Sequence, residues 1–303
     1  MAINESGLVV ELHRGSIGGA NATKIYSRVG VTNTTTETVA WGSGIDTGLT
    51  GENVSIALNS SGYCVALHRG TGANSAQHYY RVGQVNASTK TITWGTTTNY
   101  DTGGDLAVAM DDSNHVVEVH RGNPSGGSPN NHYYRVGALN PTAKTISWLT
   151  GGTLYATGGA LSLAVDNSGH CLEVHRGSPG GSNAANHYYQ LGTINYTTGV
   201  ITWGSGTNYD TGGDLDIALT SAGACLEVHR GDPAGSNADN HYYKIGTVNW
   251  SAGTVSWSSG ALFETGGAVA VAIDNNKNGL NVHRGRDGGS NESEHYAALI
   301  KVP

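Results

Sequence analysis

Hydrophobic and polar positions along this chain form short runs that recur throughout its length. Between residues 78 and 122 the runs read HYYRVGQV, TKTITWG, DLAVAMD and HVVEVHRG, each seven or eight residues long. They are rich in Val, Ile, Tyr and Thr, which favour strands, and turn-forming residues separate them. None has the length or the 3.6-residue period of a helix. The pattern predicts four antiparallel strands, named A, B, C and D here in the order of these runs.

The tripeptide His-Arg-Gly, which closes strand D, sets the period of the repeat. Its histidines are His13, His68, His120, His175, His229 and His283, at steps of 52 to 55 residues. A fixed period of this size indicates one unit copied along the chain, and four strands in about 54 residues is the size of a propeller blade. We therefore expect residues 1–303 to form a single all-β domain. It would be a β-propeller of four-stranded antiparallel blades, built of about six repeats.

The number of blades follows from the number of strands. Strands A and D recur six times but B and C only five, because the chain starts at Ala2-Ile3-Asn4, in the tail of a C strand, and ends after an A strand. Six blades are favoured, one of them incomplete or closed by both termini, with five or seven blades as alternatives. Small and branched residues on both faces of strand C place it innermost, in the order C-D-A-B. An unpaired edge strand favours a homo-oligomer.

Charge and hydropathy argue against nucleic-acid binding, membrane insertion and a signal peptide. Only 13% of residues are charged and the net charge is −7, which disfavours nucleic acid, since phosphate binding needs clustered Lys and Arg. No apolar run reaches the ~18 residues that a membrane span needs, so we expect no membrane insertion. The N-terminal segment MAINESGLVVELHRG lacks the basic start and apolar stretch of a signal peptide. The localisation is otherwise unknown, with the cytoplasm or export by a non-classical route as the two expectations.

The three cysteines occupy one repeat position. Cys64, Cys171 and Cys225 each precede a repeat histidine by four residues. Equivalent positions in separate repeats lie further apart than the roughly 7 Å that a disulfide tolerates. We therefore interpret these cysteines as small buried hydrophobic residues.

Polar and aromatic residues gather where the D-to-A and B-to-C connections share one end of each blade. His-Arg-Gly ends strand D, His-Tyr-Tyr opens strand A, Trp ends strand B, and an aromatic residue with an acid precedes Thr-Gly. The first copy has Ile45-Asp46 in place of Tyr100-Asp101. The predicted carbohydrate-binding residues are Trp41, Trp94, Trp148, Trp203, Trp257, Tyr100, Asp101, Tyr155, Tyr209, Asp210, His68, Arg69, His120, Arg121, His175, Arg176, His229 and Arg230.

These residue types suit a neutral ligand with many hydroxyl groups. An aromatic ring stacks on the apolar face of a sugar, while Asp, Arg and His make directed hydrogen bonds to hydroxyls. Five or six weak sites on one face would gain strength by multivalency. Structural interpretations stay open beside this one. The tryptophans and the first Tyr of strand A can pack between blades, and the repeat Arg can pair with the strand D glutamates Glu11, Glu118, Glu173 and Glu227.

The sequence gives no sign of an enzyme, a cofactor or a metal centre. No nucleophile, zinc-protease or phosphate-loop motif is present, and near-equal copies of each polar residue favour binding over catalysis. Eleven of the thirteen histidines fall at two repeat positions, but no Cys or carboxylate spacing marks a dedicated zinc site. The run Asp274-Asn275-Asn276-Lys277-Asn278-Gly279 lacks the later Glu of a calcium loop and is interpreted as a turn. We expect no catalytic residues, no cofactor and no metal.

The motifs YRVG, ITWG, YDTG and VEVH, which recur over the whole chain, carry a family resemblance. The chain resembles the PLL-type bacterial β-propeller lectins, which bind fucose and related glycans. The resemblance implies glycan binding in pockets between blades, no catalysis and frequent oligomers. That family has seven blades, whereas six His-Arg-Gly units are present here. The predicted function is a multivalent lectin for fucose or related glycans, with a protein-interaction or structural propeller as the alternative and a propeller glycosidase as the weaker rival.

Overall fold

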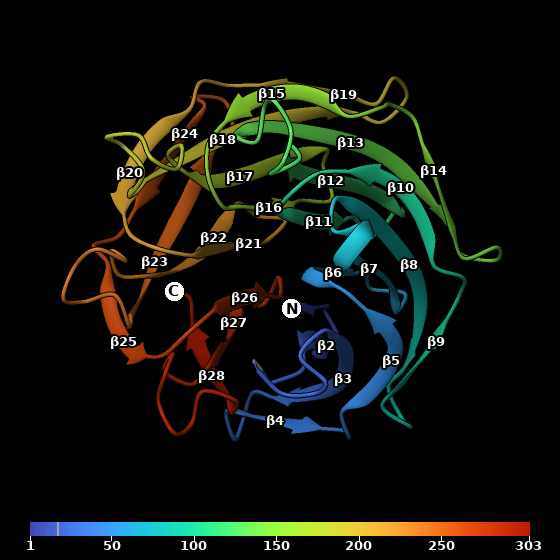
Figure 1. Ribbon diagram of the computed structural model, residues 1–303. Coiled ribbons are helices and arrows are strands. Elements are labelled where there is room, and N and C mark those ends of the chain that lie inside the picture. The colour runs from blue at the N-terminus through green and yellow to red at the C-terminus, as the bar shows by residue number, and fades with distance from the viewer. Residues whose placement is uncertain (17) are drawn as a thin grey trace. The chain divides into compact units, whose positions relative to one another are not determined.

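The predicted runs form strands, and the computed structural model describes residues 1–16 and 18–303. The chain divides into two compact units, one made of Met1–Ala156 and Asn195–Val200, the other of Thr157–Ile194 and Ile201–Pro303. The fold is an all-β six-bladed propeller, as the sequence repeat predicts. Figure 1 follows the blades in chain order, from blue at the N-terminus to red at the C-terminus.

Blades 1, 2 and 3 precede Thr157 and belong to the first unit, apart from the final residue of blade 3. Blade 1 comprises β1 (Ala2–Ile3), β2 (Leu8–Arg14), β3 (Lys24–Asn33), β4 (Thr38–Trp41) and β5 (Ile45–Thr50). Blade 2 comprises β6 (Glu52–Leu58), β7 (Tyr63–Arg69), β8 (Gln77–Asn86), β9 (Thr91–Trp94) and β10 (Thr98–Thr102). Blade 3 comprises β11 (Leu106–Met110), β12 (His115–Arg121), β13 (Asn131–Asn140), β14 (Thr145–Trp148) and β15 (Thr153–Thr157).

Blades 4, 5 and 6 belong to the second unit, apart from the hairpin turn Asn195–Val200 of blade 4. Blade 4 comprises β16 (Leu161–Val165), β17 (His170–Arg176), β18 (Asn186–Asn195), β19 (Val200–Trp203) and β20 (Thr207–Thr211). Blade 5 comprises β21 (Leu215–Leu219), β22 (Ala224–Arg230), β23 (Asn240–Asn249), β24 (Thr254–Trp257) and β25 (Ala261–Thr265). Blade 6 comprises β26 (Val269–Ile273), β27 (Asn278–Arg284) and β28 (His295–Lys301).

Strand order within each blade confirms the predicted sequence C-D-A-B, with strand C at one edge of the sheet, as in β11-β12-β13-β14. One feature differs from the expectation of four strands. The outer position is shared by two short strands that both pair with strand A: in blade 2, β9 pairs with the C-terminal half of β8 and β10 with its N-terminal half. This split brings the Trp that ends one short strand and the Tyr-Asp pair of the next onto the same edge of strand A.

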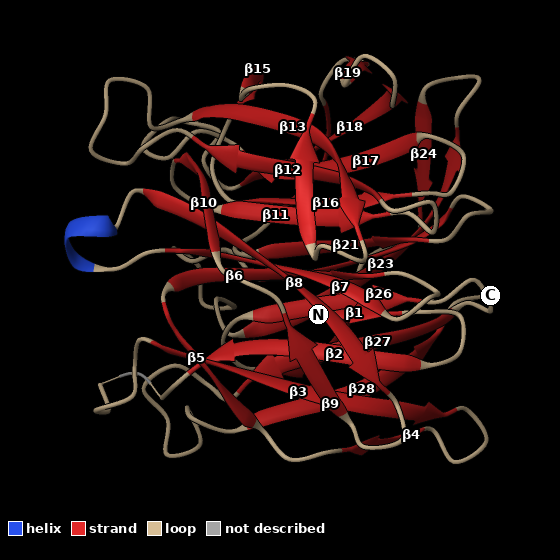
Figure 2. Cartoon of the chain, turned by 90° about the vertical axis from the view of Figure 1, so that its right-hand side faces the viewer, coloured by secondary structure: helices blue, strands red, loops and turns tan. Residues whose placement is uncertain are grey.

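The unequal strand counts expected from the sequence are also observed. Blade 6 has only three strands, and β1 is a two-residue remnant that pairs with β2. Helix is limited, among the described residues, to one three-residue 3-10 turn, η1 (Gly72–Asn74), the blue element of Figure 2. No helix within residues 1–16 and 18–303 has the length and apolar character needed to cross a membrane.

The core of each unit lies between the faces of neighbouring blades. Strand D is its centre, since Val116, Val117 and Val119 of β12 are fully buried. Tyrosine hydroxyls also join blades: the oxygen of Tyr80 on β8 accepts the backbone N–H of Ile146 on β14 at 3.2 Å. All three cysteines are free thiols with no exposed surface, which confirms the sequence interpretation.

Candidate binding site

The predicted polar residues meet where one blade faces the next. We name these places junctions by the first blade of each pair: the first junction (blades 1 and 2) and second junction (blades 2 and 3) in one unit, and the fourth (blades 4 and 5) and fifth (blades 5 and 6) in the other. Each junction combines the outer short strand of one blade with strands D, A and B of the next.

At the second junction, Tyr100 of blade 2 fills the space against blade 3. Its hydroxyl donates to Glu118 Oε1 on β12 at 3.1 Å. Its ring stacks on Trp148, which ends β14, with centroids 5.2 Å apart and an angle of 24°. Trp148 is held close to strand A because Gly137 lies beneath it, where a Cβ would come within 2.8 Å of the indole. The glycine of the YRVG motif therefore has a packing role.

The neighbouring carboxylate, Asp101, pairs with a cation of the next blade. Arg135 Nε on β13 donates to Asp101 Oδ2 at 2.5 Å, and Arg135 Nη1 donates to the carbonyl of Thr150 at 3.1 Å. Burial alone would raise the pKa of Asp101, but the hydrogen bond from Arg135 and the nearby positive charge of His120 outweigh it and lower the pKa. The ion pair thus closes the outer side of the second junction.

Behind this ion pair lies a buried network of two histidines and a glutamate. His120 Nδ1 lies 3.0 Å from Glu118 Oε1, and His120 Nε2 lies 3.8 Å from Asp101 Oδ2. Burial lowers the pKa of His120, but the charge of Glu118 and its hydrogen bond raise it by more, so the net shift is upward. The rings of His78, on β8, and His120 are nearly perpendicular, with centroids 5.1 Å apart, and His78 Nε2 donates to the carbonyl of Gly104 at 3.0 Å.

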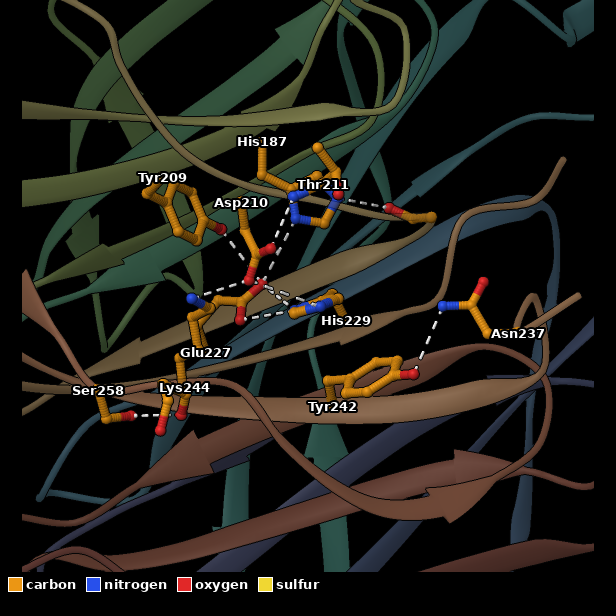
Figure 3. A network of polar contacts seen from close by, with 12 residues as sticks. His187, Tyr209, Asp210, Thr211, Glu227, His229, Asn237, Tyr242, Lys244 and Ser258 are labelled. Atoms are coloured by element: carbon orange, nitrogen blue, oxygen red, sulfur yellow. Dashed lines mark hydrogen bonds and ion pairs between the residues drawn. The ribbon is translucent and has the colours of Figure 1, made fainter. Parts of the chain in front are cut away.

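The fourth junction repeats this arrangement in the second unit (Figure 3). The Tyr209 hydroxyl donates to Glu227 at 3.1 Å, and the Tyr209 ring stacks on Trp257 at 4.8 Å. Lys244 takes the place of Arg135 and lies 2.9 Å from Asp210. His229 Nδ1 lies 2.9 Å from Glu227 Oε2, in the same arrangement as His120 and Glu118 at the second junction.

The fifth junction keeps the histidines but loses the buried glutamate; its remaining carboxylate, Glu264, is exposed and lies 3.2 Å from His283 Nε2. Phe263 occupies the place of the tyrosine, and Asn281 that of the buried glutamate, with its Oδ1 3.2 Å from His283 Nδ1. Opposite Asn281 in the register stands Ala298, where the other junctions have Arg or Lys. The tyrosine hydroxyl and the glutamate are lost together, as expected if each satisfies the other.

The first junction is hollow where the second is filled. The position of Glu118 is taken by Ala66, which pairs with Arg81 in the register of β7 and β8. Thr47 and Gly48 occupy the position of Tyr100, and Leu49 occupies that of Asp101. A small pocket results, lined by Leu12, Ile25, Thr47, Leu49, Ala66, Leu67, His68, Arg81 and Trp94. Its size suits a group such as a methyl rather than a whole sugar ring.

Arg81 and Trp94 form the polar and aromatic side of this pocket. The guanidinium carbon of Arg81 lies 5.6 Å from the centre of the Trp94 ring. Arg81 donates to two carbonyls, of Gly95 at 2.8 Å and Thr47 at 3.0 Å, whereas its counterpart Arg135 pairs with a carboxylate. His68 is buried, and burial, with the nearby charge of Arg81, lowers its pKa to about 4.

The acids that pair with His-Arg-Gly arginines stand in strand C, just before it or in a D-to-A loop, and are not the strand D glutamates considered above. Arg69 donates to Glu52 at 2.6 Å and Arg121 to Asp105 at 2.9 Å, each within its own blade. Arg230 lies 3.1 Å from Asp287 of blade 6. The strand D glutamates instead face histidines, because their side chains point into the buried interior of the junction.

The remaining predicted residues lie at equivalent strand ends. Trp41 ends β4, with the guanidinium of Arg28 5.8 Å from its ring centre. Trp203 ends β19. Tyr155 on β15 is tilted against His132 at 5.9 Å. His175 and Arg176 end β17, and His175 stacks on Tyr188 at 5.5 Å. The repeat histidines His68, His120, His175 and His229 are all buried, at 2 to 5% exposure.

One predicted equivalence is wrong. Ile45-Asp46 does not stand where Tyr100-Asp101 stands, because Asp46 pairs with Tyr26 and so matches Asn99, which pairs with Tyr79. Asp46 is exposed and lies 3.0 Å from Lys24 Nζ. Two residues bulge from β5, where β10 has only Tyr100 in its bulge, and this one-residue difference is not apparent from sequence spacing.

Arg81, Arg135 and Lys244 are site residues that were not predicted from the sequence. The predicted antiparallel pairing of strands D and A could have identified them. Each of the three lies directly opposite a strand D residue, Ala66, Glu118 or Glu227. Residues opposite each other in such a pair project to the same face of the sheet.

Comparisons with known proteins establish the fold and no family. No family model matches the chain, and no curated protein matches it. A fungal alcohol oxidase of the AA5 family, solved in complex with copper, is 12% identical with a TM-score of 0.51, covering 99% of this chain and 72% of its own. A PL25 ulvan lyase, bound to a -[GlcA(1-4)Rha3S]- saccharide, is 9% identical with a TM-score of 0.50, covering 92% of this chain and 75% of its own. At these identities the likeness concerns the propeller fold alone.

Proposed function

We propose that this protein is a glycan-binding lectin and that the pocket of the first junction is its principal site. The observation that carries the proposal is the combination of Trp94, Arg81 and an apolar hollow. At the second junction the corresponding Trp148 is covered by Tyr100 and the corresponding Arg135 is held by Asp101. The first junction combines a tryptophan with a cation that has no carboxylate partner among the described residues. The other junctions within the two units do not show this combination.

The pocket favours a 6-deoxyhexose such as fucose. The apolar walls, which include Leu12, Leu49 and Leu67, would accept the methyl group of the sugar, since burying a methyl is favourable and burying a hydroxyl without a partner is costly. The ring would lie outside, with its apolar face on Trp94, while Arg81 donates to ring hydroxyls. This chemistry supports the fucose preference that the family resemblance implies.

Titration calorimetry with two matched sugars tests the proposal. L-Fucose and L-galactose differ only by the hydroxyl on carbon 6, so we expect L-galactose to bind on the order of tenfold more weakly or worse. Arg81→Met should abolish measurable binding, whereas Arg135→Met, the same change at the closed second junction, should retain it. A protein that folds normally and binds no glycan on an array would instead support the protein-interaction or structural alternative.

The number of sites is a separate part of the proposal. Multivalency of the kind that the repeat predicts requires that further junctions accept sugar, which at the second and fourth would mean opening the ion pairs of Asp101 and Asp210. More than one fucose bound per chain would support multivalency within the chain. One fucose per chain would confine binding to the first junction.

A further inference from the structure

We propose that the buried His-Glu-His sets of the second and fourth junctions each bind a divalent transition-metal ion of the Zn²⁺ class. The sets are His78, Glu118 and His120 in one unit, and His187, Glu227 and His229 in the other. This proposal is independent of sugar binding, because neither set lines the pocket of the first junction.

The ligand atoms of each set lie close together and away from solvent. One atom from each residue lies within 4.8 Å of the other two, and all six residues are at most 3% exposed. At the fourth junction, His229 Nδ1 is 2.9 Å and His187 Nδ1 is 3.9 Å from the Glu227 carboxylate. Ligands of tetrahedral zinc are about 3.4 Å apart at bond lengths near 2.1 Å. The longest separation between ligand atoms would need to shorten by at most about 1.4 Å to meet that geometry.

The orientation of His187 leaves a lone pair facing the carboxylate. Its Nε2 lies 3.1 Å from the carbonyl of Gly213 and must donate, so in the neutral ring Nδ1 carries no proton. Within residues 1–16 and 18–303, Nδ1 has no hydrogen-bond partner, and it points toward Glu227. His78 has the same arrangement, with Nε2 on the carbonyl of Gly104 and a buried Nδ1 without a partner in the described chain. A cation between the two electron-rich atoms would satisfy both.

In each set, one outer nitrogen has the partner that a metal-ligating histidine normally has. His78 and His187 donate from Nε2 to backbone carbonyls. Nε2 of His120 and His229 lies 3.8 Å and 3.9 Å from the carboxylates of Asp101 and Asp210, which is too far for a direct hydrogen bond. A hydrogen-bonded carbonyl behind the ring fixes its orientation and strengthens it as a ligand. On metal binding, Nδ1 of His120 or His229 would release its proton to solvent, while Nε2 keeps its own.

The chain contains two internal comparisons for this site. At the fifth junction Asn281 replaces the glutamate between His241 and His283. At the first junction Ile25 and Ala66 replace the first histidine and the glutamate. We expect neither junction to bind metal, because a neutral amide is a poor ligand for Zn²⁺ beside two imidazoles and an alkyl group is none.

Refolding in the presence of metal tests the proposal. The protein is prepared without a histidine tag, unfolded, and refolded with Co²⁺ or Zn²⁺, since the buried ligands are reached most readily before folding is complete. Bound metal is counted by native mass spectrometry, and the visible absorption of Co²⁺ reports its coordination. We expect the double variant Glu118→Gln/Glu227→Gln to hold two ions fewer per chain than the parent. The matched variant Glu264→Gln, at the fifth junction, should hold the same number as the parent.

A gain of binding completes the test if the double variant does not fold. Asn281→Glu should add one ion per chain, because it supplies the carboxylate that the fifth junction lacks. The proposal is overturned if the refolded parent protein binds no metal. It is also overturned if the folded double variant binds as much as the parent, or if Asn281→Glu folds and adds none.

Discussion

The first and second junctions use the same strand positions and reach opposite results. Both contain a buried repeat histidine, a cation on strand A and a tryptophan at the end of strand B. The difference begins at one position of strand D, where the first junction has Ala66 and the second has Glu118. Without a carboxylate, burial lowers the pKa of His68 to about 4; with one, the pKa of His120 is raised.

This difference separates stability from ligand binding. At the second junction the polar groups satisfy one another and the aromatic rings stack, so the space is filled from within the chain. At the first junction the guanidinium of Arg81 and the side of Trp94 remain beside a hollow. The same strand positions can thus support either stability or ligand binding, and substitutions at both junctions test which residues decide between the two.

The largest expected effect is on stability at the second junction. Glu118→Ala leaves His120 and the Tyr100 hydroxyl buried without their shared partner, which should lower the free energy of unfolding of the metal-free protein by about 3 kcal/mol. Urea denaturation followed by circular dichroism measures the change. Glu52→Ala removes a partly exposed ion pair with Arg69 and serves as the control, with an expected loss of about 0.5 kcal/mol. Equal losses in the two variants would contradict the proposed role of Glu118.

The second effect concerns pH and acts at the first junction. The folded-state pKa of His68, about 4, lies below its unfolded value of about 6.5, so acid favours the unfolded chain, which binds the proton more readily. Lowering the pH from 7 to 5 should therefore destabilise the parent by about 2 kcal/mol through this residue. His68→Gln should remove that part of the pH dependence, as measured by urea denaturation at several pH values.

His120→Gln is the matched variant at the second junction and should behave differently. Because the folded-state pKa of His120 is raised, its charged form stabilises the fold below the unfolded pKa, and this stabilisation is lost as the pH rises through the folded value. The variant should therefore lose more stability at pH 5 than at high pH. The same pH profile in both variants would show that Ala66 and Glu118 do not set the behaviour of the two histidines.

The repeat predicted the fold better than it predicted the junctions. Strand order, the unequal strand counts and the buried cysteines follow from periodicity and composition, because each copy must solve the same packing problem. The split outer strand did not follow, since a run that reads as one loop in sequence can pair along the free half of strand A. The bulge that moves Asp46 away from the position of Asp101 was not predicted either, because it depends on how β5 pairs with strand A.

The predicted site residues also show what one-dimensional analysis cannot supply. Trp94 and His68 were selected because they recur, yet the feature that distinguishes the first junction is what is missing there, the glutamate and the tyrosine of its neighbours. Arg81 was passed over because it belongs to the YRVG motif and not to the loop-rich segments. Register across strands, not spacing along the chain, brings Arg81 and Ala66 onto one face.

The third prediction converts the open junction into a closed one. Leu49→Asp places a carboxylate where Asp101 stands in the next junction, within reach of Arg81. We expect the new ion pair to compete with the sugar and weaken fucose binding about tenfold, or about 1.4 kcal/mol. Calorimetry measures the affinity, and Leu49→Asn is the control for size and polarity without charge. Unchanged affinity in Leu49→Asp would show that the free guanidinium is not what binds the ligand.

The smallest expected effect tests whether tyrosine and glutamate act as a pair. Tyr100 accompanies Glu118 and Tyr209 accompanies Glu227, whereas Phe263 accompanies Asn281. In a double-mutant cycle, Tyr100→Phe and Glu118→Asn should each destabilise the metal-free protein, and the double variant should be more stable than the sum of the two losses implies, by about 1 kcal/mol. The reason is that each single change strands a buried polar group, while the double change recreates the combination found at the fifth junction. Additive losses would mean that the hydrogen bond between the two side chains contributes nothing of its own, and that their joint replacement at the fifth junction reflects packing alone.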